Sequence, residues 1–203
     1  MKEVFNDIVS NLYKPKFKEI GFKTSSITFR RKIYDFVIIF DVWKSVWNTN
    51  DEITFWFEIG VYREDFYEFI FDESGPKNIR SNHCSIKLSS GFVLNKESPQ
   101  YAYKLNKKNK EKIIEEIEND MDCKIIPFLN SIVSIKDILK FKDLDNIYCD
   151  KANLFVGFAL SKLNKKDEAS KLIEEYLSTS KYPKNWTNRI IKECDILNLN
   201  INH

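Results

Sequence analysis

Apolar residues recur every three to four positions at the start of the chain, a spacing that is typical of a helix. The stripe from Val4 to Ile20 predicts an amphipathic helix with one apolar face. Pro15 interrupts the stripe, so we expect the helix to kink or restart there. Gly21 follows the last apolar position, where glycine suits the end of a helix because it adopts positive φ without strain.

The next part of the chain alternates apolar and polar residues with period two, which predicts consecutive antiparallel strands joined by short turns. Residues 27–33 alternate clearly, and residues 35–43 are apolar on both faces, as expected for a central strand. Residues 53–62 give the cleanest alternation. A fourth strand is predicted at about 83–88, whereas residues 64–71 fit a short helix or a strand equally well.

Helical spacing returns near residue 107 and continues towards the end of the chain. It predicts a long helix over about 107–140, kinked at Pro127, and then a helical hairpin followed by a final helix from about Asn185. Gly157 and Ala169 lie twelve positions apart, as the small residues of a tetratricopeptide repeat do. No second copy of the pattern is visible, so a solenoid is not predicted.

These patterns together predict an α+β fold. We expect an antiparallel β-sheet of four to five strands packed against helices, followed by a C-terminal helical hairpin. We place the α+β domain at residues 1–141, and the hairpin with the terminal helix at residues 142–203.

Composition and charge narrow the classes of protein. With 43% hydrophobic residues the chain can bury a core. Its 32 basic and 30 acidic residues nearly balance, which disfavours broad electrostatic capture of nucleic acid or anionic lipid but leaves room for a local patch. No secretory signal or bilayer-length apolar run occurs, so we expect a cytoplasmic protein without a membrane segment.

Cysteine and histidine give little sign of catalysis or metal binding. His83 and Cys84 are neighbours on the predicted strand, so their side chains should point to opposite faces, with Cys84 towards the core beside Ile86 and Leu88. His203 is the last residue, where we expect fraying. No CxxC spacing occurs, and scattered thiols are expected to be reduced and mostly buried. The cysteines are Cys84, Cys123, Cys149 and Cys194.

Two carboxylates stand in the middle of predicted strands. Asp41 and Glu58 lie in strongly apolar runs, where a charged group either reaches water or finds a partner. Arg30 falls on the same predicted face, so an Arg30 salt bridge to one of them is the simplest explanation. A catalytic carboxylate pair of the glycosidase type is the alternative.

Aromatic and basic residues share that face of the predicted sheet. Trp43 and Trp56 lie near Arg30 and Lys87, in a set that also holds Trp47, Tyr62 and Lys32. Such a surface can pack beneath a helix, bind a protein partner, or stack the bases of single-stranded nucleic acid.

Several segments of the chain resemble a known family when they are taken in order. They are Leu12-Tyr-Lys-Pro15, Gly21-Phe22, Thr28-Phe29-Arg30, Phe57-Glu-Ile-Gly-Val61 and Ile126-Pro-Phe-Leu-Asn-Ser131. Over roughly residues 3–140 the chain is similar to the bacterial domain of unknown function 4304 family, although Asp41 stands where a glutamine is expected. The resemblance implies an α+β domain and no established activity, so it supplies no catalytic residue.

No nucleotide-binding, nucleophile-elbow or zinc-protease motif occurs in the sequence, and we predict no cofactor and no metal. The leading hypothesis is a non-catalytic cytoplasmic binding module in a regulatory or immunity-like role, with a protein partner. The alternatives are a hydrolase that uses the mid-strand carboxylates and, third, a single-stranded nucleic-acid binder. The sequence specifies no oligomeric state. The candidate binding residues are Arg30, Asp41, Trp43, Trp56, Glu58 and Lys87.

Overall fold

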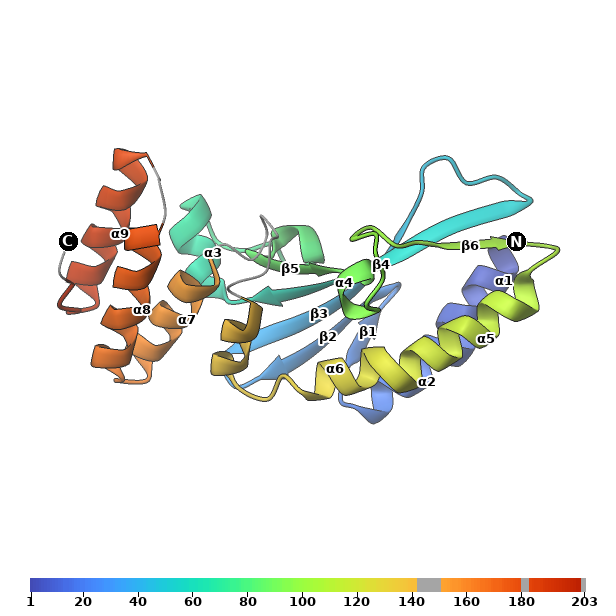
Figure 1. The fold of residues 1–203 in the computed structure, drawn as a ribbon, viewed down its shortest axis with the longest axis horizontal. Coiled ribbons are helices and arrows are strands. Elements are labelled where there is room, and N and C mark those ends of the chain that lie inside the picture. Colours follow the sequence, from blue (N-terminus) through green and yellow to red (C-terminus); the bar gives the residue numbers. More distant parts are fainter. Residues whose placement is uncertain (142–150, 180–182, 202–203) are drawn as a thin grey trace. The chain divides into compact units, whose positions relative to one another are not determined.

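The computed structural model describes residues 1–141, 151–179 and 183–201 (Figure 1). The chain divides into two compact units, Met1–Val133 and Ser134–His203, which are described separately. The first unit holds an antiparallel sheet with helices and the second holds helices, so the predicted α+β fold is confirmed. None of the helices within the described ranges is long and apolar enough to cross a lipid bilayer.

The described residues of the first unit form a six-stranded antiparallel sheet in the order β1, β2, β3, β4, β5, with β6 also paired to β4. β5 pairs with residues 58–61 of β4 and β6 with residues 52–55, so the two lie end to end along one edge. β1 and β6 were not predicted, because such short segments show too little alternation. The strands are β1 (Lys23–Ser25), β2 (Thr28–Ile33), β3 (Phe36–Lys44), β4 (Glu52–Tyr62), β5 (Ile86–Ser89) and β6 (Tyr103–Asn106).

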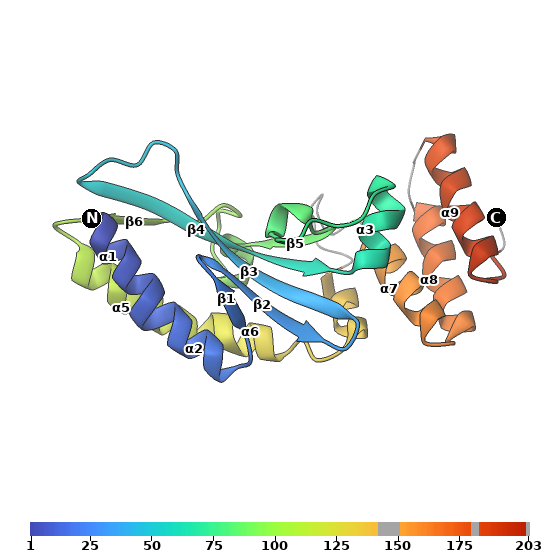
Figure 2. The ribbon, with the colours of Figure 1, turned by 180° about the vertical axis from the view of Figure 1, so that it is seen from behind.

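Two long helical segments lie side by side against one face of this sheet (Figures 1 and 2). A short π-helical turn comes just before Pro15 in the first segment and just before Pro127 in the second. A π turn accommodates proline because the missing N–H would otherwise break the regular ladder. The segments are α1 (Lys2–Asp7), η1 (Ile8–Tyr13) and α2 (Lys14–Glu19), and α5 (Lys110–Asp120), η3 (Met121–Ile125) and α6 (Ile126–Asn130).

Aromatic side chains fill the space between the sheet and these helices. Phe40 and Phe57 stack at 4.7 Å between ring centroids, and Phe17 of α2 lies 4.6 Å from Phe40. Tyr13 is almost fully buried beside them, and this burial raises the pKa of its hydroxyl. Gly21 ends the first helix at φ +84°, in the role predicted for it. We call this side of the sheet the core face.

The predicted helix over 107–140 is too long, since its α-helical part ends at Asn130. The chain then forms the 3₁₀ helix η4 (Ile135–Phe141), where Asp137 accepts a hydrogen bond from the backbone N–H of Ser134 at 2.8 Å. Ile135 and Ile138 are buried as their spacing suggested. A spacing of three fits a 3₁₀ helix as well as an α-helix, so apolar periodicity does not reveal the break.

The prediction of a strand from about residue 83 to 88 is wrong in its first half. Residues 64–71 form the helix α3 (Glu64–Phe71), Ser81–His83 form the 3₁₀ turn η2, and the strand β5 begins only at Ile86. Backbone hydrogen bonds from His83 to Arg80 and from Cys84 to Ser81 form this turn, and the backbone N–H of Arg80 also donates to Nδ1 of His83 at 3.0 Å. A short helix, α4 (Ser90–Val93), follows β5 directly.

Cys84 consequently does not lie on the core face with Ile86 and Leu88, as the alternation suggested. It packs on the opposite face of the sheet against Ile39 and Tyr62, with Tyr67 of α3. The period-two pattern of the sequence includes residues 83–85, which precede β5 and are not part of the sheet. It therefore assigns Cys84 to the wrong face.

The second unit contains the predicted helical hairpin and terminal helix. Ala152–Ser161 of α7 is buried on all sides, and an added Cβ on Gly157 would lie 2.8 Å from Cγ1 of Ile173, so α7 and α8 approach closely. The terminal helix joins α8 where the indole N–H of Trp186 donates to the hydroxyl of Tyr176 at 3.3 Å. The helices are α7 (Ala152–Lys162), α8 (Lys166–Thr179) and α9 (Lys184–Ile196).

Candidate binding site on the sheet

The strand register brings the six candidate residues to one face of the sheet. Asp41 pairs with Glu58, and Trp43 pairs with Trp56, across β3 and β4. Directly paired residues of antiparallel strands point to the same side. The same register links Arg30 through Ile39 and Gly60 to Lys87. All six therefore lie opposite the core face, on what we call the outer face.

The segment Ile79–Cys84, called the covering segment below, is fixed to this face by Asp41. The guanidinium of Arg80 donates to both carboxylate oxygens of Asp41, with Nε–Oδ2 and Nη2–Oδ1 distances of 3.0 Å. The backbone N–H of Ser81 and the hydroxyl of Thr28 donate to the same carboxylate at 3.2 and 2.8 Å. Asp41 is fully buried. These donors compensate the desolvation of its charge.

Arg30 does not form the ion pair expected from the sequence. The Nε of Arg30 donates to the carbonyl oxygen of Ile79 at 2.8 Å. Arg80 instead pairs with Asp41, where the sequence predicted Arg30. Partial burial lowers the pKa of Arg30. Arg80 was missed because it lies in a loop, and alternation along strands carries no information about which loop folds over them.

Ser81 links Glu58 to Trp43 across the outer face. Its hydroxyl donates to Oε2 of Glu58 at 2.6 Å and accepts the indole N–H of Trp43 at 3.0 Å. The guanidinium of Arg80 lies 4.0 Å from the centroid of the Trp43 ring, in a cation–π contact. Trp43 is thus held in one position, with its cross-strand neighbour Trp56 beside it.

The outer face is covered in one region and accessible in another. Tyr67 of α3 packs over Ile39 and Tyr62, near the end of the sheet where β3 begins. At the other end, Trp43 and Trp56 are both partly exposed. The sequence left open whether a helix covers the aromatic face, and the helix α3 covers only the end that lacks the tryptophans.

His83 and Cys84 are not arranged for nucleophilic catalysis. Nδ1 of His83 accepts the Arg80 backbone N–H, while the Cys84 thiol points at the Arg80 carbonyl oxygen at 3.6 Å. Burial, with a smaller contribution from Arg80, lowers the pKa of His83, and burial raises that of Cys84. Cys194 is buried as well, whereas Cys123 is exposed. Cys149 and His203 lie outside the described residues.

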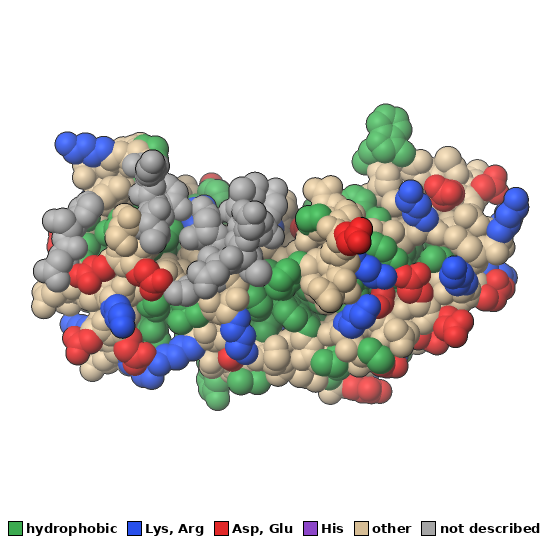
Figure 3. Space-filling view, in the orientation of Figure 1, with side chains coloured by type: hydrophobic (Ala, Val, Ile, Leu, Met, Phe, Trp, Pro, Cys, Tyr) green, Lys and Arg blue, Asp and Glu red, His purple; other side chains and the backbone are tan. Residues whose placement is uncertain are grey.

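The loop between β3 and β4 carries the most exposed large apolar residues of the described ranges. Val46 and Trp47 are each 88% exposed. The loop is nevertheless held to β4 by hydrogen bonds, because the side chain of Asn48 both donates to and accepts from the backbone of Thr54. Figure 3 shows hydrophobic atoms standing clear of the surface above this loop. Three of the four tryptophans of the chain lie on this one hairpin.

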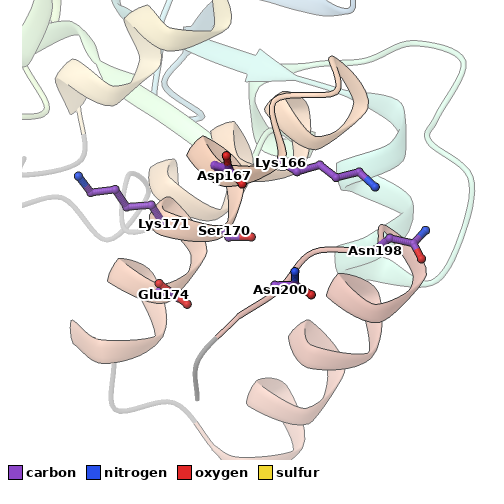
Figure 4. A pocket seen from close by; sticks show the side chains of 7 residues that line it. All are labelled: Lys166, Asp167, Ser170, Lys171, Glu174, Asn198 and Asn200. Atoms are coloured by element: carbon purple, nitrogen blue, oxygen red, sulfur yellow. The ribbon is translucent and has the colours of Figure 1, made fainter.

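A separate hollow of about 320 Å³ lies in the second unit, between α8 and the segment after α9. Lys166 and Lys171 point in different directions, and Asp167 and Glu174 carry the opposite charge (Figure 4). The charged groups do not converge on a common point, so the hollow lacks the features of a ligand site. Within the described residues, no three or more His, Cys, Asp or Glu side chains cluster closely enough to hold a metal ion.

The fold and the outer face define the class of protein. It is an α+β domain with an antiparallel sheet, on which the partly exposed Trp43 is held by a polar network built on Ser81 and Arg80. A family model described as Domain of unknown function (DUF4304) matches residues 13–131, and the chain belongs to this family. No curated protein and no solved structure matches the chain.

Proposed function

We propose that the protein is a cytoplasmic, non-catalytic binding module in a regulatory or immunity-like role, and that a protein partner binds to the outer face at Trp43 and Trp56. The observation that supports this is the pair of partly exposed indoles, of which that of Trp43 is held in place by the covering segment. Fixed aromatic side chains are favoured binding anchors, because little side-chain entropy is lost when the partner docks.

A hydrolase is supported less well by the same contacts. A general acid or base needs a carboxylate that can exchange a proton with substrate. Asp41 is fully buried and accepts from Thr28, Arg80 and Ser81, while Glu58 accepts from the Ser81 hydroxyl. This pattern favours anchoring of the covering segment as the role of both carboxylates.

The proposal is tested by placing a photo-crosslinking amino acid at position 54, which lies beside Trp56 on the outer face of β4, and, as a control, at the exposed position 112 of α5. Irradiation in cells of the source organism should join one discrete polypeptide to the chain from position 54 and not from position 112. Absence of a position-specific product, together with hydrolytic turnover by the purified chain that Glu58→Gln abolishes, would reject the proposal in favour of the enzyme.

A further inference from the structure

One cation of the chain already stacks on the tryptophan pair of the outer face. The guanidinium of Arg80 lies 4.0 Å from the centroid of the Trp43 ring and pairs with Asp41 at the same time. An indole face attracts a cation because the ring carries negative charge density above and below its plane. Trp56 pairs with Trp43 across the strands and is partly exposed, and no cation among the described residues stacks on it. One ring of the pair is therefore occupied, and the other is open to a ligand.

Glu58 places a carboxylate next to the open ring. It follows Trp56 by two positions on β4, so both side chains point to the outer face. Its Oε2 accepts the hydroxyl of Ser81 at 2.6 Å, whereas no described residue donates to its Oε1. The side chain is partly exposed, so the covering segment leaves part of it accessible. A carboxylate oxygen makes its strongest hydrogen bonds with charged donors, so ring and oxygen together suit a cation.

The charges around Trp56 favour a positive ligand of small size. Asp41 is buried and neutralised by Arg80. On the open part of the outer face, the described strands carry the carboxylates of Glu52 and Glu58 and the ammonium of Lys104. Negative charge is therefore in slight excess beside the indole. The covering segment closes the face beyond Glu58, so the site takes a single side chain rather than an extended segment lying along β4.

We propose that the protein partner presents an arginine side chain to this site, stacked on the indole of Trp56 and hydrogen-bonded to Oε1 of Glu58. This inference rests on the proposed function and specifies what the partner contributes. Arginine suits the site better than lysine, because a planar guanidinium stacks on an aromatic ring and still donates hydrogen bonds from its edge. A polynucleotide carries a phosphate at every step and would meet the carboxylate of Glu58.

The test measures fluorescence anisotropy with the full chain and four labelled probes: random copolymers of tyrosine with arginine, with lysine and with glutamate, and single-stranded poly(dT). We expect preference for the arginine copolymer, with affinity reduced about tenfold by Trp56→Ala and about fivefold by Glu58→Gln, which keeps an acceptor for Ser81. Lys104→Glu should raise affinity about threefold, because it replaces a like charge with an opposite one. The exposed Glu115 of α5 provides the matched control, and Glu115→Gln should change affinity by less than about twofold.

Circular dichroism and thermal melts establish that each variant is folded before affinities are compared. Equal binding by all variants, weaker binding by Lys104→Glu, or no binding of the arginine copolymer overturns the inference. Preference for the lysine or the glutamate copolymer that still depends on Trp56 also overturns it, but leaves the proposed binding surface standing. Preference for poly(dT) that depends on Trp56 would assign the surface to nucleic acid and reject both proposals.

Discussion

At the scale of single residues, one buried carboxylate holds a loop against the sheet. Asp41 receives hydrogen bonds from Thr28 on the neighbouring strand, and from Arg80 and the Ser81 N–H of the covering segment. A buried carboxylate with several donors is favourable only while all of them are present, because an unpaired buried charge is costly. The position of the covering segment, and with it that of Trp43, therefore depends on this residue.

Asp41→Ala should lower the free energy of unfolding by about 2–4 kcal/mol, because it leaves Arg80 and the Ser81 N–H without their acceptor. Urea denaturation measures the change, and hydrogen exchange at the Ser81 amide should accelerate. The exposed Glu52 is the control on the same face, and Glu52→Ala should change stability by less than about 0.5 kcal/mol. A similar small effect for Asp41→Ala would contradict the anchoring role.

His83 should make stability fall on mild acidification. Its pKa in the folded state is lowered by burial and by Arg80, so the unfolded chain binds the proton more readily. The stability contributed by neutral His83 is present above about pH 6.5, the unfolded value, and is lost as the pH falls towards the lower folded value. Melting temperatures measured from pH 7.5 to 5 should decline less steeply for His83→Ala than for the natural chain. Parallel declines would show that the Nδ1 contact is unimportant.

At the scale of secondary-structure elements, the hairpin of β3 and β4 has two different faces. Its core face packs Phe40 and Phe57 against the helices, whereas its outer face is covered partly by α3 and partly by the covering segment. Gly60 permits this second contact: an added Cβ would lie 2.5 Å from Sγ of Cys84. The absence of a side chain at this position lets the covering segment approach β4.

Gly60→Ala should therefore destabilise the protein by about 1–3 kcal/mol through overpacking. Adding Cys84→Ala removes the sulfur from the contact, so the double variant should be more stable than the sum of the two single effects predicts, by at least about 0.5 kcal/mol. Denaturant unfolding of the four proteins of this cycle measures the coupling. Strict additivity would mean that Gly60 and Cys84 do not constrain each other.

At the scale of the whole molecule, the first unit contains every element of the outer face. The described sheet, the two helical segments on its core face and the covering segment all fall within Met1–Val133. The match to the DUF4304 family lies inside the same range.

The fragment 1–133 should fold alone and unfold cooperatively, because the sheet and the helices that cover its core face are both retained. Circular dichroism, together with a single urea transition seen by tryptophan fluorescence, checks this outcome, with the full chain as reference. An uncooperative transition, or loss of ellipticity, would show that residues beyond 133 are needed for the first unit to fold.

The sequence by itself determined the α+β class, the main antiparallel strands and the residues that share the outer face. These features follow from local periodicity, since alternation along a strand fixes the side to which each residue points. Residues 53–62 illustrate this, because the predicted strand matches β4 closely. The helical spacing of apolar residues likewise predicted the C-terminal helical hairpin of α7 and α8.

Only the tertiary structure decided what covers that face. The partner of Asp41, the side on which Cys84 packs and the turn at Ser81–His83 all depend on a loop returning across the sheet. Loop closure brings together residues nearly 40 positions apart, and no periodic pattern records such a contact. The sequence placed Trp43 and Trp56 on one face, and the fold leaves both partly exposed because α3 packs at the other end of the face and the covering segment reaches only one side of Trp43.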